Sequence, residues 1–346
     1  MKREYLLALL SSYLPMVAYA GSNFILVPVL LKALGERNFG IYMMLYSIAQ
    51  YMSIGVGWLG GVAVRLIGVY EARKDEKKLT KVTALVFYYF IAYGTIVAFA
   101  AIFASQLLDL DFTMKVSVVL LGVYLFFNYL LQSIVNILFA YNMQIISNLL
   151  KTFPVIFYTI VTIMLLKYWQ QAIVTPILAL LVSVIVILPA VMKYSIKLGC
   201  FVNPFIIEKE TIRETFLSVG FWNFLYGLLL ISIMQDRIFL GFFVSPESVS
   251  KFTVLWTIPN FLVMVLWRVS EVLQPYFVRL SVKNVKYLRN LFIKNIFVVS
   301  GIGMLFGCLY ALFGNFILSL WIGKIPDFSS NYSLLLAEVL LFFKYR

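Results

Sequence analysis

Long apolar runs separated by short polar gaps constrain this chain more than any other feature. About ten runs occur, at residues 6–31, 39–64, 82–104, 116–139, 149–166, 173–192, 216–244, 252–278, 291–313 and 332–343. A helix needs roughly 20 apolar residues to cross a bilayer, and all but the last run approach that length. Since 63% of the residues are hydrophobic and 12% are charged, the chain is too apolar for a soluble core. The sequence predicts an all-α, polytopic transmembrane helix bundle with about ten spans.

The basic residues fall mainly in alternate gaps. One set of gaps and ends holds 20 of the 28 Lys and Arg residues, from Lys2 and Arg3 to Lys344 and Arg346, and this set includes Lys151. Because Lys and Arg are retained on the cytoplasmic side during insertion, the N-terminus is predicted to be cytoplasmic. The net charge of +13 follows from this topology and from contact with anionic lipids. We expect the lipid bilayer as a partner and no nucleic acid.

Missing residue types narrow the function. The chain has no histidine, which removes the commonest general base and the commonest metal ligand. No stretch has the G-x-x-x-x-G-K-[ST] pattern of a phosphate-binding loop. The loops between runs leave little room for a catalytic domain outside the bilayer. We expect neither cofactor nor metal, and a transporter is favoured over an enzyme with its site inside the bundle.

Four ionisable residues lie deep within predicted spans: Asp236 and Arg237 in the seventh, and Arg268 and Glu271 in the eighth. Each costs of order 3 kcal/mol near the bilayer centre, so such residues usually pair with one another or face an aqueous site. The two pairs can neutralise each other internally. Alternatively, Arg237 and Arg268 bind a phosphate, whose oxygens match the guanidinium fork, and Asp236 or Glu271 binds a coupling proton or cation.

Side-chain amides also recur within spans. Asn128, Gln132 and Asn136 are spaced by four residues, so they form one stripe on one helix, and Asn223 lies in the seventh span. Hydrogen bonding between helices is one interpretation. The other is a water-filled cavity whose amides bind sugar hydroxyls, with these four residues as candidate contacts.

A weak internal repeat divides the chain. A shift of about 210 residues aligns Tyr42, Leu45, Tyr46 and Ile48 with Phe252, Leu255, Trp256 and Ile258. Transporters are often built from two related halves. We therefore expect a six-helix N-terminal lobe at residues 1–213 and a C-terminal lobe of about four helices at 214–346. A full second half would end near residue 402, about 210 beyond the first, which predicts an incomplete second lobe in a shortened chain, or a natural ten-span form completed by another subunit.

Four segments carry a resemblance to a known family. Residues 24–42 (FILVPVLLKALGERNFGIY) combine an apolar run, Leu-Gly, a polar turn and Phe-Gly-x-Tyr, and residues 57–65 end the second span with small residues and Arg65. Residues 235–243 (QDRIFLGFF) and 317–323 (ILSLWIG) follow in the second half. Together they resemble the Wzx-type polysaccharide flippases (O-antigen, capsule or exopolysaccharide) of the multidrug/oligosaccharidyl-lipid/polysaccharide (MOP) exporter superfamily.

The resemblance implies a two-lobe MOP/MATE-like exporter of the bacterial inner (plasma) membrane that works by alternating access. Its substrate would be a polyprenyl-diphosphate-linked oligosaccharide, flipped outward for a separate polymerase or ligase in surface polysaccharide biosynthesis. Arg65, Arg237 and Arg268 would contact the diphosphate.

Two alternatives remain open from the sequence. One is a cation-coupled drug exporter of the same superfamily, which the motifs do not separate from a sugar exporter. The other is a membrane-embedded polysaccharide polymerase.

Overall fold

The structure is a computed structural model, and it describes residues 2–323 apart from 142, 170–171, 205–206, 214, 217–220, 233–235 and 284. Within these residues the chain forms helices joined by turns, and no strand occurs. Eight of the described helical stretches are long and apolar enough to cross a membrane. The predicted all-α, polytopic architecture is therefore confirmed. The tenth predicted span, residues 332–343, lies outside the described residues.

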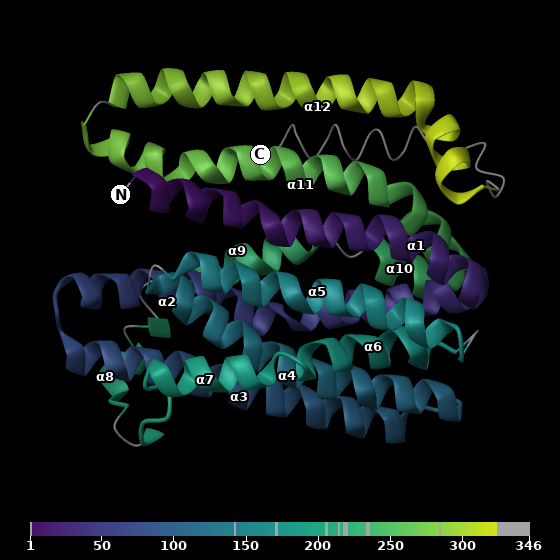
Figure 1. Cartoon of the computed structure of the whole chain (residues 1–346), viewed down its shortest axis with the longest axis horizontal. Helices are drawn as coiled ribbons and strands as arrows, with labels where there is room; N and C mark the ends of the chain where they lie inside the picture. The colour runs from purple at the N-terminus through teal and green to yellow at the C-terminus, as the bar shows by residue number, and fades with distance from the viewer. Residues whose placement is uncertain are drawn as a thin grey trace. The chain divides into compact units, whose positions relative to one another are not determined.

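Helix α1 (Lys2–Met52) contains the first predicted span and the start of the second in 51 residues. A straight helix of that length would measure about 77 Å, more than twice the ~30 Å hydrocarbon core of a bilayer. The break lies at Gly35, whose φ of 76° and ψ of 166° are rarely accessible to a residue with a side chain. Figure 1 shows α1 doubling back on itself before α2. We call residues 2–34 the first arm and residues 36–52 the second arm.

The chain divides into two compact units, Met1–Ser250 and Lys251–Arg346. After α1, the first unit contains α2 (Ile54–Ala72), α3 (Glu76–Leu107), α4 (Phe112–Ala140), α5 (Gln144–Leu166), α6 (Val174–Ile185), α7 (Leu188–Lys197), α8 (Lys209–Arg213), α9 (Phe221–Ser232) and α10 (Asp236–Phe243). Helix α11 (Pro246–Lys283) begins at the end of this unit, and α12 (Val285–Ile322) belongs to the second. The predicted lobes at 1–213 and 214–346 divide at a different residue, and their boundary stays a prediction.

Short capped turns set the direction of the helices. The Asp75 side chain accepts a hydrogen bond from the Lys78 backbone N–H at 3.1 Å, and Asp111 does the same for Met114 at 3.2 Å. Such N-caps satisfy backbone donors that a helix start leaves unpaired. Helices α3 and α4 therefore begin sharply after tight turns. Only a few residues separate α4 from α5, so these two helices run in opposite directions.

The first arm of α1 and α5 run parallel to each other. The Asn148 side-chain amide donates to the Ser11 hydroxyl at 3.0 Å, and the Thr159 hydroxyl donates to that of Ser22 at 2.7 Å. The two members of each pair are 137 residues apart in sequence. A step of 11 residues forward along α1 therefore matches a step of 11 residues forward along α5, which only parallel helices allow. Side-chain hydrogen bonds thus join the first arm to α5 within the predicted membrane region.

The segment between α7 and α8 packs on α3. The Tyr88 hydroxyl donates to the Val202 carbonyl at 2.8 Å, and the Lys81 ammonium donates to the Glu208 carboxylate. Lys81 is buried and Glu208 is exposed. The hydrogen bond and positive charge of Lys81 hold the pKa of the Glu208 carboxyl below its usual range. In the same segment, burial raises the pKa of the Cys200 thiol to about 12, so this thiol stays neutral.

Candidate functional site

A cavity of about 320 Å³ lies within the first unit. Its wall combines residues of α1, α2, α3, α4, α5 and α6: Tyr19, Ser22, Tyr46, Gln50, Ser53, Val56, Gly57, Phe90, Tyr124, Asn128, Tyr129, Leu131, Gln132, Asn136, Lys151, Pro154, Val155, Tyr158, Leu180, Ser183 and Val184. Hydroxyl and amide groups are frequent on this wall. None of the described lining residues is Asp or Glu.

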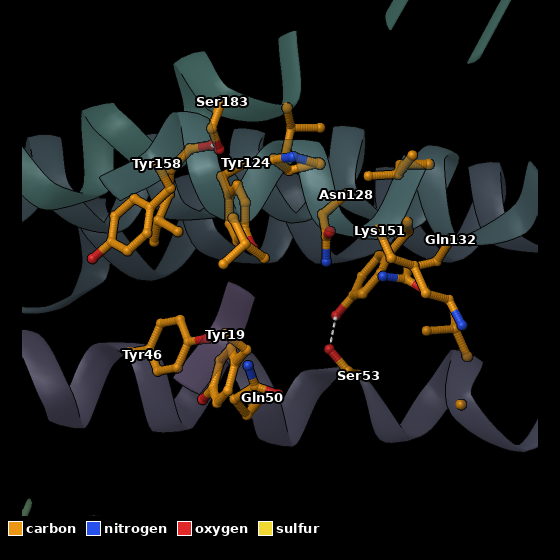
Figure 2. A pocket seen from close by; sticks show the side chains of 18 of the residues that line it. Tyr19, Tyr46, Gln50, Ser53, Tyr124, Asn128, Gln132, Lys151, Tyr158 and Ser183 are labelled. Atoms are coloured by element: carbon orange, nitrogen blue, oxygen red, sulfur yellow. Dashed lines mark hydrogen bonds between the residues drawn. The ribbon is translucent and has the colours of Figure 1, made fainter. Parts of the chain in front are cut away.

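The cavity has two chemically different ends. Figure 2 shows Tyr19, Tyr46, Tyr124 and Tyr158 toward one end, which we call the tyrosine end. Asn128, Gln132 and Lys151 lie toward the other, which we call the amide end. The antiparallel course of α4 and α5 explains this separation. Moving along α4 toward its turn into α5 leads from Tyr124 to Gln132, about 12 Å at 1.5 Å per residue.

The predicted amide stripe lies on the cavity wall. Asn128, Gln132 and Asn136 all line the cavity from α4, as their spacing of four residues predicts for one helical face. A Cβ on Gly60 of α2 would lie 2.9 Å from the Asn136 Nδ2 atom. The glycine therefore gives the Asn136 amide the room it occupies. The structure brings these three predicted residues together, while their role in substrate binding stays a prediction.

Lys151 supplies a positive charge at the amide end. It lies about two turns after the start of α5, is partly buried and lines the cavity. Its ammonium also lies 5.9 Å from the centroid of the Phe139 ring, a distance typical of a cation–π contact. Sequence reasoning used this lysine only to assign topology. Asn136 lies about one turn before the end of α4, and Lys151 lies about two turns after the start of α5. The nearness of both residues to the connection between the helices is the signal that would have identified Lys151.

Hydroxyl groups dominate the tyrosine end. The Tyr42 and Tyr158 hydroxyls are joined by a hydrogen bond of 2.6 Å, which ties the second arm of α1 to α5. Tyr42 is itself buried. Because this end draws tyrosines from both arms of α1, from α4 and from α5, no local sequence pattern reveals it.

Arg237 and Asp236 lie beside the tyrosine end. Both are on α10 and partly buried, and α10 packs against α1. The electrostatic neighbours of Arg237 include Tyr19 and Tyr46, which line the cavity, together with Asp236. Arg237 is therefore a second cation close to the cavity, at the end away from Lys151.

Of the four other predicted residues, only Arg65 has a side chain that the structure describes. Arg65 is exposed on α2 and is not among the lining residues. Asn223 is on α9, and Arg268 and Glu271 are on α11 three residues apart. The side chains of these last three lie outside the described residues. The predicted roles of all four residues remain untested.

The donor set does not favour a metal site. Within the described part of the chain, no group of three or more Cys, Asp or Glu residues is arranged to hold an ion. The cavity wall can donate and accept hydrogen bonds, and it can attract negatively charged groups.

Comparisons with known proteins bear on the fold. No protein-family model matches the chain, and the search of curated proteins finds no match. An inward-facing multidrug resistance transporter of the MATE family and MOP superfamily aligns with a TM-score of 0.70 at 14% identity, over 96% of this chain and 79% of its own. The MATE multidrug transporter DinF-BH aligns with a TM-score of 0.60 at 13% identity, over 97% and 77%.

A third similar structure is a MOP superfamily transporter from Pyrococcus furiosus Vc1, for which a reverse polarity of the binding pocket suggests a different function. It aligns with a TM-score of 0.56 at 15% identity, over 97% of this chain and 77% of its own. The agreement extends over nearly the whole chain in each case. This chain therefore has the fold of the MATE transporters of the MOP superfamily.

Proposed function

We propose that this protein moves a polyprenyl-diphosphate-linked oligosaccharide from the cytoplasmic to the outer face of a bacterial plasma membrane by alternating access. The N-terminus is cytoplasmic in this proposal. A polymerase or ligase on the outer face would then consume the flipped substrate. The transporter fold supports membrane transport in general, and the chemistry of the cavity favours this class of cargo.

The composition of the cavity wall carries the proposal. An amide offers both donors and acceptors, so Asn128, Gln132 and Asn136 match the hydroxyl groups of a sugar. Lys151 adds a positive charge, and no described lining residue is acidic. A neutral or anionic polyhydroxylated group is complementary to such a wall.

Arg237 is the preferred contact for the diphosphate. Its guanidinium lies beside the tyrosine end, next to Tyr19 and Tyr46. A planar guanidinium forms paired hydrogen bonds with phosphate oxygens. Arg65 and Arg268 are proposed to contact the diphosphate, and Asn223 the sugar, in other states of the transport cycle. Asp236 and Glu271 are proposed to bind the coupling proton or cation.

A cation-coupled drug exporter is the second candidate. Two of the similar structures are multidrug transporters. The tyrosine end favours such a cargo, because aromatic faces attract organic cations. No described residue of the cavity wall is acidic, and Asp236 beside the tyrosine end is adjacent to Arg237. Both observations argue against a cationic cargo, since a buried cation needs a compensating charge.

Depletion of the protein in its native host tests the proposal. Surface polysaccharide and lipid-linked precursors would be measured together, with drug susceptibility recorded in the same cultures. We expect loss of polymer and accumulation of single repeat units on the cytoplasmic face. Single units that reach the surface unpolymerised would indicate a polymerase instead. An unchanged polysaccharide with increased drug sensitivity would support the drug exporter.

A further inference from the structure

Lys151 and the amide stripe form one polar environment. Lys151 lies on α5 shortly after the turn from α4, and Gln132 and Asn136 lie on α4 shortly before it. All three line the cavity, and Figure 2 shows Lys151 and Gln132 at the same end. The ammonium and the amides therefore share one end of the cavity. A sugar bound at this end would lie among all of them.

The two cations of this region are spatially separate. Tyr158 lies seven residues beyond Lys151 on α5, about 10 Å along the helix. The electrostatic neighbours of Arg237, Tyr19 and Tyr46, lie with Tyr158 toward the tyrosine end. Lys151 on the cavity wall and Arg237 beside the tyrosine end are therefore cations at opposite ends of the cavity.

The two cations also differ in chemistry. The forked guanidinium of Arg237 suits the several oxygens of a diphosphate, whereas the ammonium of Lys151 is a compact point charge on a flexible stem. The ammonium matches a single carboxylate on a sugar whose neighbouring hydroxyls are hydrogen-bonded to the cavity wall. Because the described wall carries no carboxylate, an anionic cargo meets no repulsion at this end.

We propose that Lys151 binds a carboxylate on the sugar itself, so that the oligosaccharide carried by this protein contains an acidic sugar of the uronic acid type. This inference rests on the proposed function. It assigns the diphosphate to the tyrosine end, beside Arg237, and the acidic sugar to the amide end. Lys151 is then the residue that selects acidic repeat units over neutral ones.

Binding to the purified full-length protein in lipid nanodiscs tests this assignment. Three probes separate the two sources of negative charge: a farnesyl-diphosphate-linked disaccharide that ends in glucuronic acid, its counterpart that ends in glucose, and farnesyl diphosphate without sugar. We expect the wild-type protein to bind the glucuronic acid probe about tenfold more tightly than the glucose probe, as a charge-assisted hydrogen bond provides.

Substitutions at the two ends of α5 complete the test. Lys151→Gln should remove the preference for glucuronic acid and leave the affinity for farnesyl diphosphate unchanged, while Lys151→Arg should keep most of the preference. Lys167→Gln is the matched control, because it removes a lysine from the other end of α5, where the side chain is exposed and outside the cavity. It should behave as the wild type.

The outcomes separate this inference from the proposed function. Equal binding of the two disaccharide probes to the wild type would overturn the acidic-sugar assignment alone. Loss of farnesyl diphosphate binding in Lys151→Gln would assign Lys151 to the diphosphate and also overturn it. Failure of the wild type to bind any of the three probes would overturn the proposed function itself. These wild-type measurements decide the matter even if a variant does not fold.

Discussion

The tyrosine end and the amide end of the cavity use their polar groups differently. At the tyrosine end, the Tyr42 and Tyr158 hydroxyls bond to each other and join α1 to α5. At the amide end, the hydrogen bond that Figure 2 draws joins the Ser53 and Tyr129 hydroxyls at 3.5 Å, and none is drawn from Asn128 or Gln132. The first arrangement stabilises the helix bundle. The second presents donors and acceptors to the cavity, which is the arrangement that a ligand requires.

Removal of the amides should have the largest effect. The double variant Asn128→Leu with Gln132→Leu should weaken binding of a lipid-linked oligosaccharide about a hundredfold, because several hydrogen bonds of about 1 kcal/mol each are lost. Titration of the purified variant measures this. Ser117→Ala removes a hydroxyl that bonds to Thr113 on the same helix, outside the cavity, and should bind normally. Equal losses in both variants would refute a special role for the amide end.

A negative charge at the amide end should have the next largest effect. Gln132→Glu keeps the size of the side chain but places a carboxylate at the end of the cavity that holds Lys151. We expect about tenfold weaker binding of anionic probes and a gain of affinity for a cationic dye. Gln132→Met is the uncharged control. An increase in anion binding by Gln132→Glu would contradict the account.

Two glycines of α2 test the space around Asn136. A Cβ on Gly60 would lie 2.9 Å from the Asn136 side chain, whereas a Cβ on Gly68, outside the cavity wall, meets nothing within 4 Å. Both Gly60→Ala and Gly68→Ala gain about 1 kcal/mol of helix propensity. Gly60→Ala should displace the amide and weaken oligosaccharide binding a few-fold, as binding titrations would show. Similar affinities for the two variants would remove Asn136 from the site.

Tyr158→Phe should affect stability more than binding. The change removes the hydroxyl that bonds to Tyr42 at 2.6 Å, which lowers the free energy of unfolding by about 1 kcal/mol. A thermal melt in nanodiscs should show a midpoint lowered by a few degrees, with the affinity for the sugar probes nearly unchanged. Loss of sugar binding at unchanged stability would reverse the roles assigned to the two ends.

The smallest effect is expected outside the cavity, at Glu208. Since Lys81 lowers the pKa of Glu208, the ion pair contributes stability above the unfolded pKa of about 4.3 and loses it as pH falls through the lower folded value. The melting temperature of Glu208→Gln should therefore lie slightly below that of the wild type at pH 7. The difference should shrink as the pH falls below the unfolded value. A difference that stays constant under acidic conditions would show that the pair does not act through charge.

The spans and the amide stripe were predictable because each depends on local periodicity. Apolar runs reveal membrane helices wherever they occur, and a spacing of four residues places Asn128, Gln132 and Asn136 on one face. The turn at Gly35 also falls between the first two predicted spans. These features require no knowledge of which helices are neighbours.

The rest of the site depends on contacts between distant segments. The tyrosine end gathers residues from α1, α4 and α5, and only the packing of these helices brings them together. Lys151 was interpreted as a marker of the cytoplasmic side, because a basic residue near the start of a span is as typical of that side as of a binding site. The ion pair of Lys81 with Glu208 joins residues 127 positions apart, a pairing that no sequence pattern indicates.

Reconstitution of the full-length protein into liposomes would show whether it moves a lipid-linked oligosaccharide. A fluorescent lipid-linked oligosaccharide would be placed in the bilayer, and its movement between leaflets would be followed by quenching from one side. We expect the protein to accelerate this movement, Asn128→Leu with Gln132→Leu to abolish the acceleration, and Ser117→Ala to preserve it. Transport of a cationic dye without movement of the lipid-linked oligosaccharide would refute the proposed function.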